Sequence, residues 1–158
     1  MMTLLQWSAW LMLMCCGLWA GVILTFQVER INLWARMPIE QFAVDFRRSL
    51  FRVDPLQPIL AALASIAGGY FAWFSLGMPR LLAWVGVVLM VFVVVASIVI
   101  AEPINSRFRD LPEGQLPDGV ERYRIVWRRF HTARTIFTLA AFACCAGAVV
   151  LGRSTFQR

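Results

Sequence analysis

The sequence contains one histidine, and it stands beside arginine at the start of the last long apolar segment. In WRRFHTAR, Trp127, His131 and Arg134 are separated by four and then three positions, and Thr138 follows four positions later. Spacings of three and four place side chains on one face of a helix. Imidazole serves as a general base near neutral pH, and guanidinium stabilises a developing oxyanion. This face therefore predicts proton abstraction beside an anion-binding group.

Polar residues at the ends of two earlier apolar segments are candidates to complete such a site. EPIN brings Glu102 and Asn105 to the end of the third segment, and QVER ends the first segment with Glu29. An ionisable group at membrane depth usually faces the protein interior and has a partner there. We expect Arg134 to pair with Glu102 or Glu29, and Asn105 and His131 to line the same cavity.

Simpler interpretations apply to each residue alone. Arg134 fits an arginine that extends toward lipid headgroups, and Trp127 fits an interfacial anchor. One histidine beside Glu102 or Glu29 supplies too few ligands to predict an iron or copper site. The sequence therefore predicts no metal site, and it leaves the cofactor unknown and dependence on a transition metal open.

Composition indicates which elements must hold these residues. Hydrophobic residues make up 60% of the 158 positions, and the mean hydropathy is +0.69. A soluble domain of this length needs a more polar surface. Four stretches without charge are long enough to cross a bilayer as helices. They lie before Glu29, between Asp54 and Arg80, between Arg80 and Glu102, and between Arg134 and Arg153.

The sequence therefore predicts an all-α, polytopic membrane protein, because only helices and closed barrels satisfy the backbone in lipid. We expect one domain over residues 1–158, a bundle of four transmembrane helices at about 4–27, 57–76, 81–102 and 125–152. Small residues at four-residue intervals predict close helix packing: Gly17 and Gly21; Ala61, Ser65 and Gly69; Ala140, Cys144 and Ala148. The pairs Cys15–Cys16 and Cys144–Cys145 fit helix packing better than a copper(I) site.

Arginine placement predicts the topology. Two substantial loops, residues 28–55 and 102–131, lie on one side and contain eleven of the fifteen arginines, whereas the other side has Arg80, Arg153 and Arg158. The positive-inside rule places these loops in the cytoplasm and both termini outside, in a multi-pass protein of the inner (plasma) membrane. The net charge of +6 arises from arginines that flank apolar segments. This placement favours lipid headgroups over nucleic acid as their partner.

The stretches EPINSRF and WRRFHTARTIFTLAAFA resemble the DUF1772 family of small four-helix membrane proteins. The residues that carry the resemblance are Pro103 and Asn105 after the third helix, then Trp127, His131 and Arg134 entering the fourth. GVILTFQVE and FRRSLFRVDPLQP also resemble the first helix and the following loop of that family. The family includes anthrone-oxygenase-like proteins, so the resemblance implies an oxygenase that converts an anthrone into an anthraquinone.

We therefore expect a membrane-embedded oxygenase-like enzyme that acts with O2 on a hydrophobic aromatic substrate of the anthrone or phenol type. His131 would be the base, and Arg134 and Asn105 would stabilise the anion. The residues expected to bind substrate are Trp127, Glu102, Glu29 and Thr138. The alternative is a non-catalytic membrane protein that binds a quinone-like lipid or a partner protein in the same pocket. In both cases the sequence leaves open whether the protein forms a homo-oligomer.

Overall fold

The computed structural model describes residues 3–52, 56–112 and 115–152, and over these ranges it is helical, without strands. Four helical stretches are long and apolar enough to cross a membrane by length and composition: Leu4–Arg36, Leu56–Phe74, Gly77–Arg109 and Val120–Leu151. The all-α prediction with four membrane-spanning helices is therefore confirmed. The element bounds are α1 Leu4–Thr25, η1 Phe26–Arg30, α2 Ile31–Arg36, α3 Ile39–Arg52, α4 Leu56–Phe74, α5 Gly77–Ala96, η2 Ser97–Ala101, α6 Glu102–Arg109 and α7 Val120–Leu151.

Short local signals set several helix starts. The hydroxyl of Thr3 accepts from the N–H of Gln6, and the Gln6 side chain accepts from the N–H of Thr3, which forms a capping box before α1. Gly77 at the start of α5 has a φ of 63°, and Gly119 before α7 has a φ of 75°. These left-handed conformations are readily accessible only to glycine, so both positions allow the chain to turn into the next helix.

The first and third long helices continue past the ends that the charge pattern predicts. Instead of stopping near residues 27 and 102, α1 passes through η1 into α2, and α5 passes through η2 into α6. Both η1 and η2 are single π-helical turns, which widen the helix locally and often accompany functional sites. The connecting segments on this side consequently consist largely of helix. A charged residue marks the end of the apolar stretch, but the backbone hydrogen bonds continue beyond it.

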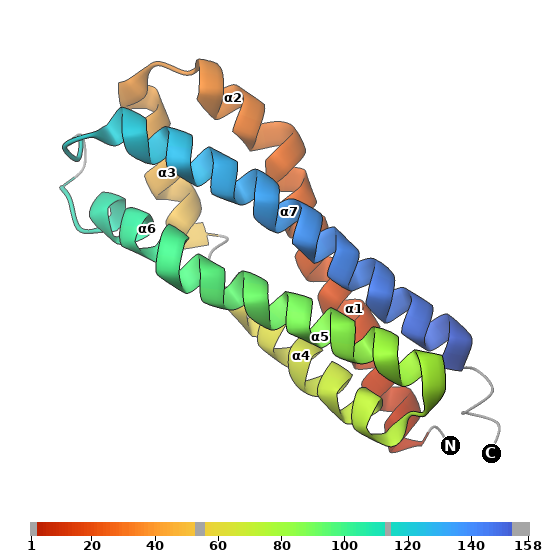
Figure 1. Cartoon of the computed structure of the whole chain (residues 1–158). Helices are drawn as coiled ribbons and strands as arrows, with labels where there is room; N and C mark the ends of the chain where they lie inside the picture. Colours follow the sequence, from red (N-terminus) through yellow and green to blue (C-terminus); the bar gives the residue numbers. More distant parts are fainter. Residues whose placement is uncertain (1–2, 53–55, 113–114, 153–158) are drawn as a thin grey trace.

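The four long helices pack side by side, with α1 against α4 and α7, and α5 against α4 and α7 (Figure 1). The residues buried in α4 include Ala61, Ala64 and Gly68, and those in α7 include Ala141, Cys145 and Ala148. Of the predicted stripes, Ala61 and Ala148 are buried as expected, whereas Gly69 is only partly buried and Ala140 is exposed. Spacing alone fixes the period of a stripe but not its phase.

A second core lies at one end of the molecule, where α2, α3, α6 and the start of α7 gather (Figure 1). α1 starts and α7 finishes at the opposite end. Aromatic rings dominate this second core. Trp34, fully buried, makes edge contacts with Phe42, Phe46 and Trp127 at centroid distances of 5.8, 5.3 and 5.4 Å. Phe108 of α6 contacts Phe46 at 4.8 Å. Trp127, near the start of α7, is therefore packed within this aromatic core.

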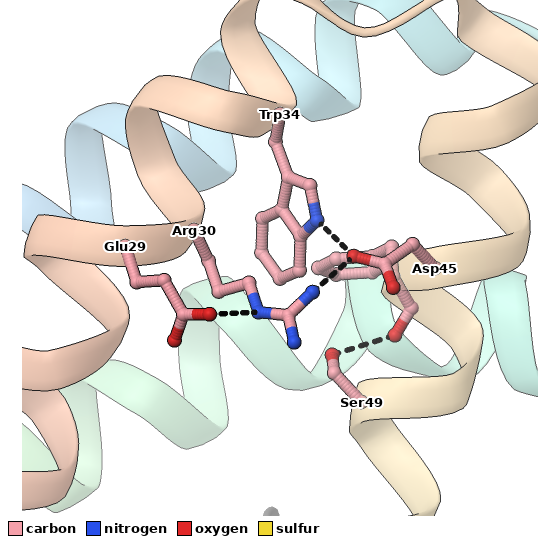
Figure 2. Close-up of polar contacts among 6 residues, drawn as sticks. Glu29, Arg30, Trp34, Asp45 and Ser49 are labelled. Atoms are coloured by element: carbon pink, nitrogen blue, oxygen red, sulfur yellow. Dashed lines mark hydrogen bonds and ion pairs between the residues drawn. The ribbon is translucent and has the colours of Figure 1, made fainter.

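A carboxylate fixes the orientation of the central tryptophan (Figure 2). Asp45 of α3 accepts from Nε1 of Trp34 at 2.7 Å and from Nη1 of Arg30 at 2.9 Å. The Nε atom of Arg30 lies 3.9 Å from the carboxylate of Glu29, and the Ser49 hydroxyl donates to a backbone carbonyl one turn earlier in α3. These contacts fasten α3 to η1 and α2, so the aromatic core and the long helices form one connected unit.

Candidate functional site

A cavity of about 450 Å³ lies where α1, α3, α4, α7 and the α5–η2–α6 junction meet. This volume is typical of small-molecule sites, which span roughly 300–1,000 Å³. Its polar lining residues are Gln57, Ser97, Glu102, Asn105, Arg109 and Arg134. Its apolar lining residues are Trp19, Leu50, Phe51, Pro58, Ala61, Val94, Ile98 and Ala101.

The buried wall of the cavity is polar, and its exposed lining is mainly apolar apart from the partly exposed Glu102–Arg109 pair. Gln57, Asn105 and Arg134 are all buried, whereas the lining side chains with the greatest exposure are apolar, including Ile98 at 62% and Phe51 at 57%. Ile98 lies within Gly77–Arg109, a stretch that is long and apolar enough to span a membrane. The opening therefore suits a hydrophobic compound that enters from the membrane, and the buried wall suits its polar group.

The arginine of the predicted site is held by the histidine. Nε and Nη2 of Arg134 lie 3.1 and 2.8 Å from Nδ1 of His131, and Nε2 of His131 lies 3.2 Å from the carbonyl oxygen of Ile23. A guanidinium can only donate, so Nδ1 accepts; a carbonyl can only accept, so Nε2 carries the proton. The His131 ring is fully buried and is not part of the cavity lining. It lies behind Arg134 and links α7 to the last turn of α1.

Trp127 completes the support of this pair. Its ring stacks on the imidazole of His131 with centroids 5.0 Å apart and planes inclined by 18°, and its Nε1 donates to Oδ1 of Asn105 at 3.1 Å. The guanidinium of Arg134 lies 5.4 Å from the Trp127 ring and 5.7 Å from the Phe130 ring. Cation–π contacts of this kind favour the charged group where water is excluded. Trp127 thus contacts both Asn105 and Arg134 and holds these two cavity-lining side chains in position.

Two threonines on the same helical face have a backbone role. Thr138, expected to bind substrate, is buried, and its hydroxyl donates to the carbonyl of Arg134 at 2.7 Å. Thr135 donates in the same way to the carbonyl of His131 at 2.8 Å. Neither threonine lines the cavity. The structure therefore brings Thr138 to the predicted face, but its hydroxyl is engaged one turn back along α7.

The two predicted carboxylates have arginine neighbours other than Arg134. Glu102 lines the cavity and accepts from Nη2 of Arg109 at 3.0 Å. Glu29 is 63% exposed at its side chain, lies near Arg30, and is outside the cavity lining. Of the two residues, only Glu102 is therefore positioned to meet a bound molecule. The π-turn η2 directly precedes Glu102 and contributes Ser97, Ile98 and Ala101 to the cavity lining.

Of the lining residues, sequence reasoning predicted only Glu102, Asn105 and Arg134 as site residues, and those it missed include Trp19, Gln57, Ser97 and Arg109. Gln57 and Ser97 carried a usable signal, since each is a polar side chain inside an otherwise apolar helix. Trp19 carried no such signal, because a tryptophan in a membrane helix most often has only a packing role. In the described parts of the chain, no group of three or more His, Cys, Asp or Glu side chains is arranged to hold a metal ion.

Comparison with known proteins identifies the family. A family model described as anthrone oxygenase matches residues 46–144, which is more than half of the chain. The matched range includes Asn105, Trp127, His131 and Arg134. No curated protein and no solved structure matches the chain. The family match together with the membrane-type helices confirms the resemblance seen in the sequence, and the chain belongs to the anthrone oxygenase family.

Proposed function

We propose that the cavity binds a hydrophobic phenolic aromatic of the anthrone type and that the protein promotes its oxidation by O2. The observation that carries this proposal is the buried guanidinium of Arg134 on the wall of a cavity whose opening is apolar. A fixed cation in a site of low dielectric stabilises an anion far more than it would in water. The membership of the anthrone oxygenase family supports the choice of substrate class.

The chemistry requires an anion first. Loss of a proton from the central CH2 group of an anthrone gives a conjugate base whose negative charge lies largely on the carbonyl oxygen. Arg134 would stabilise that oxygen, and the side-chain amides of Asn105 and Gln57 lie in the same lining as hydrogen-bonding groups. Trp19 supplies an aromatic surface for the ring system. Each interaction grows stronger as charge develops, which is the condition for catalysis.

Oxygen then reacts with the electron-rich carbon of this anion. Addition of O2 forms a C–O bond and, after protonation, a hydroperoxide at the former CH2 carbon. Loss of the remaining C–H proton and cleavage of the O–O bond release water and leave a carbonyl group. One oxygen atom ends in the quinone and the other in water, and the CH2 carbon supplies the four electrons that reduce O2.

The proton acceptor has two candidates among the predicted residues. His131 as the base stays a prediction, and it requires the imidazole to release a contact, because Nδ1 accepts from Arg134 and Nε2 carries a proton. Glu102 is a carboxylate in the cavity lining, and its pairing with Arg109 is compatible with accepting a proton from a bound molecule. The contacts of His131 support a positioning role for it.

The location fits the same chemistry. O2 and flat aromatic compounds both partition into lipid, and Ile98, one of the exposed lining residues, lies on a stretch that could span the membrane. We propose that the protein is a multi-pass protein of the plasma membrane with α2, α3 and α6 in the cytoplasm, because arginines cluster there.

Oxygen uptake by the purified, full-length protein tests the proposal. Anthrone would be supplied in detergent micelles, and both O2 loss and anthraquinone formation would be recorded against protein-free autoxidation. Arg134→Gln should lower kcat by about 100-fold or more, as loss of an oxyanion donor does. Arg129→Gln is the matched control, because Arg129 is an exposed arginine of the same helix. Saturable binding of anthraquinone without accelerated O2 uptake would instead support the non-catalytic alternative.

A further inference from the structure

A second cavity lies against the first and shares Phe51 with it. Its volume is about 350 Å³, and it is bounded by α3, by Phe108 of α6, and by Pro112, Gln115 and Leu116 of the connection to α7. The charged side chains that line it are Arg47, Arg48, Arg52 and Glu40. Three arginines and a single carboxylate, all from α3, therefore line a cavity at the end of the molecule where the arginines of the sequence concentrate.

These arginines lack carboxylate partners among the residues that the structure describes. No salt bridge joins Arg47, Arg48 or Arg52 to an acidic side chain there, although Arg30, Arg109 and Arg124 each have one. Nη1 of Arg47 is buried and has no hydrogen-bond partner, and its guanidinium lies 6.0 Å from the Phe51 ring. A buried N–H without an acceptor is unfavourable and rare. The cavity thus presents a donor that an anionic oxygen would satisfy.

The rim of this cavity is apolar and exposed. Val44, Phe51 and Leu116 line it with large exposed hydrophobic side chains. α3 buries Phe42, Phe46 and Leu50 in the aromatic core, whereas its Arg48 and Arg52 are exposed beside the apolar rim. A soluble anion needs only the arginines, whereas an anionic lipid also covers the apolar rim with its glycerol and acyl carbons.

We propose that this cavity binds the phosphate headgroup of an anionic phospholipid, with Arg47, Arg48 and Arg52 as its ligands. Anionic lipids populate the cytoplasmic leaflet, and basic pockets near that surface are suited to their headgroups. The acyl chains would extend from the rim past Phe51, next to the opening of the first cavity. The proposal rests on the second cavity and on the proposed cytoplasmic placement of α3, and it does not depend on the oxidative chemistry.

Native mass spectrometry of the full chain in detergent, titrated with phosphatidylglycerol or phosphatidylcholine, tests this site. We expect one phosphatidylglycerol to be retained in preference to phosphatidylcholine. The triple variant Arg47→Gln, Arg48→Gln, Arg52→Gln should lose affinity by about fivefold for each arginine. The matched control is Arg36→Gln, Arg122→Gln, Arg129→Gln, which removes the same charge from exposed positions at the same end of the molecule and should retain the lipid.

Three results would overturn the proposal. The first is equal retention of the two lipids by the unmodified protein. The second is an equal loss in the two triple variants, which would assign the effect to the overall charge. The third is saturable binding of inorganic phosphate, measured by calorimetry in detergent, without retention of phosphatidylglycerol. That last result would assign the arginines to a soluble anion. Circular dichroism of each variant reports whether the helices are intact.

Discussion

The guanidinium of Arg134 donates from Nε and Nη2 to the same nitrogen, Nδ1 of His131, at 3.1 and 2.8 Å. The other ring nitrogen faces the carbonyl oxygen of Ile23, so the imidazole bridges α7 and the last turn of α1. This bridge fixes the position of a charged group on the wall of the cavity. A group fixed before the reaction stabilises developing charge without the cost of reorganisation.

His131→Gln should separate a positioning role from a base role. With the bridge weakened, Arg134 is displaced, and a shift of about 1 Å in a catalytic group lowers the rate by roughly 100-fold. Because both ring nitrogens are engaged, we expect kcat/KM for anthrone oxidation to fall by a similar factor at every pH. The measurement is the pH profile of O2 uptake by the variant and the unmodified protein. Disappearance of the acidic limb in the variant alone would identify His131 as the base.

Trp127→Phe should lower stability while retaining the ring stack on His131. The substitution removes the indole N–H that donates to Oδ1 of the buried Asn105 at 3.1 Å. Loss of a buried hydrogen bond of this kind costs about 1–2 kcal/mol. The midpoint of thermal unfolding in detergent measures the effect, with Trp10→Phe as the control because Trp10 is exposed on α1. An equal shift in the two variants would contradict a specific role for the indole N–H.

Gly86→Ala should destabilise the packing of α5 on α7. A Cβ atom at Gly86 would lie 2.7 Å from Sγ of Cys145 and 3.4 Å from the carbonyl oxygen of Ala141, so the Cys145 side chain or the two helices must shift. Overpacking of a tight core costs roughly 1–3 kcal/mol. Gly21→Ala is the matched control, because a Cβ there meets no atom within 4 Å and alanine favours helix over glycine. Unfolding midpoints that rank the two variants in the opposite order would refute this account of the α5–α7 contact.

The topology can be checked with fusions to full-length protein. α1 starts and α7 ends at the end of the molecule away from α2, α3 and α6, and the arginine bias places that end outside the cytoplasm (Figure 1). We expect alkaline phosphatase fused after the C-terminus to be active and green fluorescent protein fused there to be dark. The reverse pattern would invert the proposed orientation but leave the fold intact.

The chemistry-bearing face of α7 was predictable because helix geometry alone determines it. Spacings of four and three fix Trp127, His131 and Arg134 on one side of any helix, and the structure buries that side. The partner of the imidazole was not predictable. It is a backbone oxygen of Ile23, 108 positions earlier in the chain, and every residue type has such an oxygen. Side-chain patterns therefore predict which side chains face the protein interior, but not which backbone atoms accept hydrogen bonds from them.

The helices in the connecting segments could not be predicted from amino-acid composition either. The stretch after Glu29 reads as polar, yet α3 is amphipathic and buries Phe42 and Phe46 against rings from α2 and α7. Its stability comes from that aromatic core rather than from lipid, so a search for apolar stretches passes over it. Arg124 adds a contact that no spacing suggests, because it donates to the carbonyl oxygens of Trp34 and Met37 at the end of α2.

The apolar opening beside Ile98 has a kinetic consequence. A compound that reaches the buried wall through lipid is present to the protein at its mole fraction in the bilayer, not at its concentration in water. Adding inert phospholipid at a fixed total amount of substrate therefore lowers the mole fraction of substrate in the bilayer around the protein. The half-saturating amount of substrate should rise in proportion to the lipid supplied, as surface dilution requires.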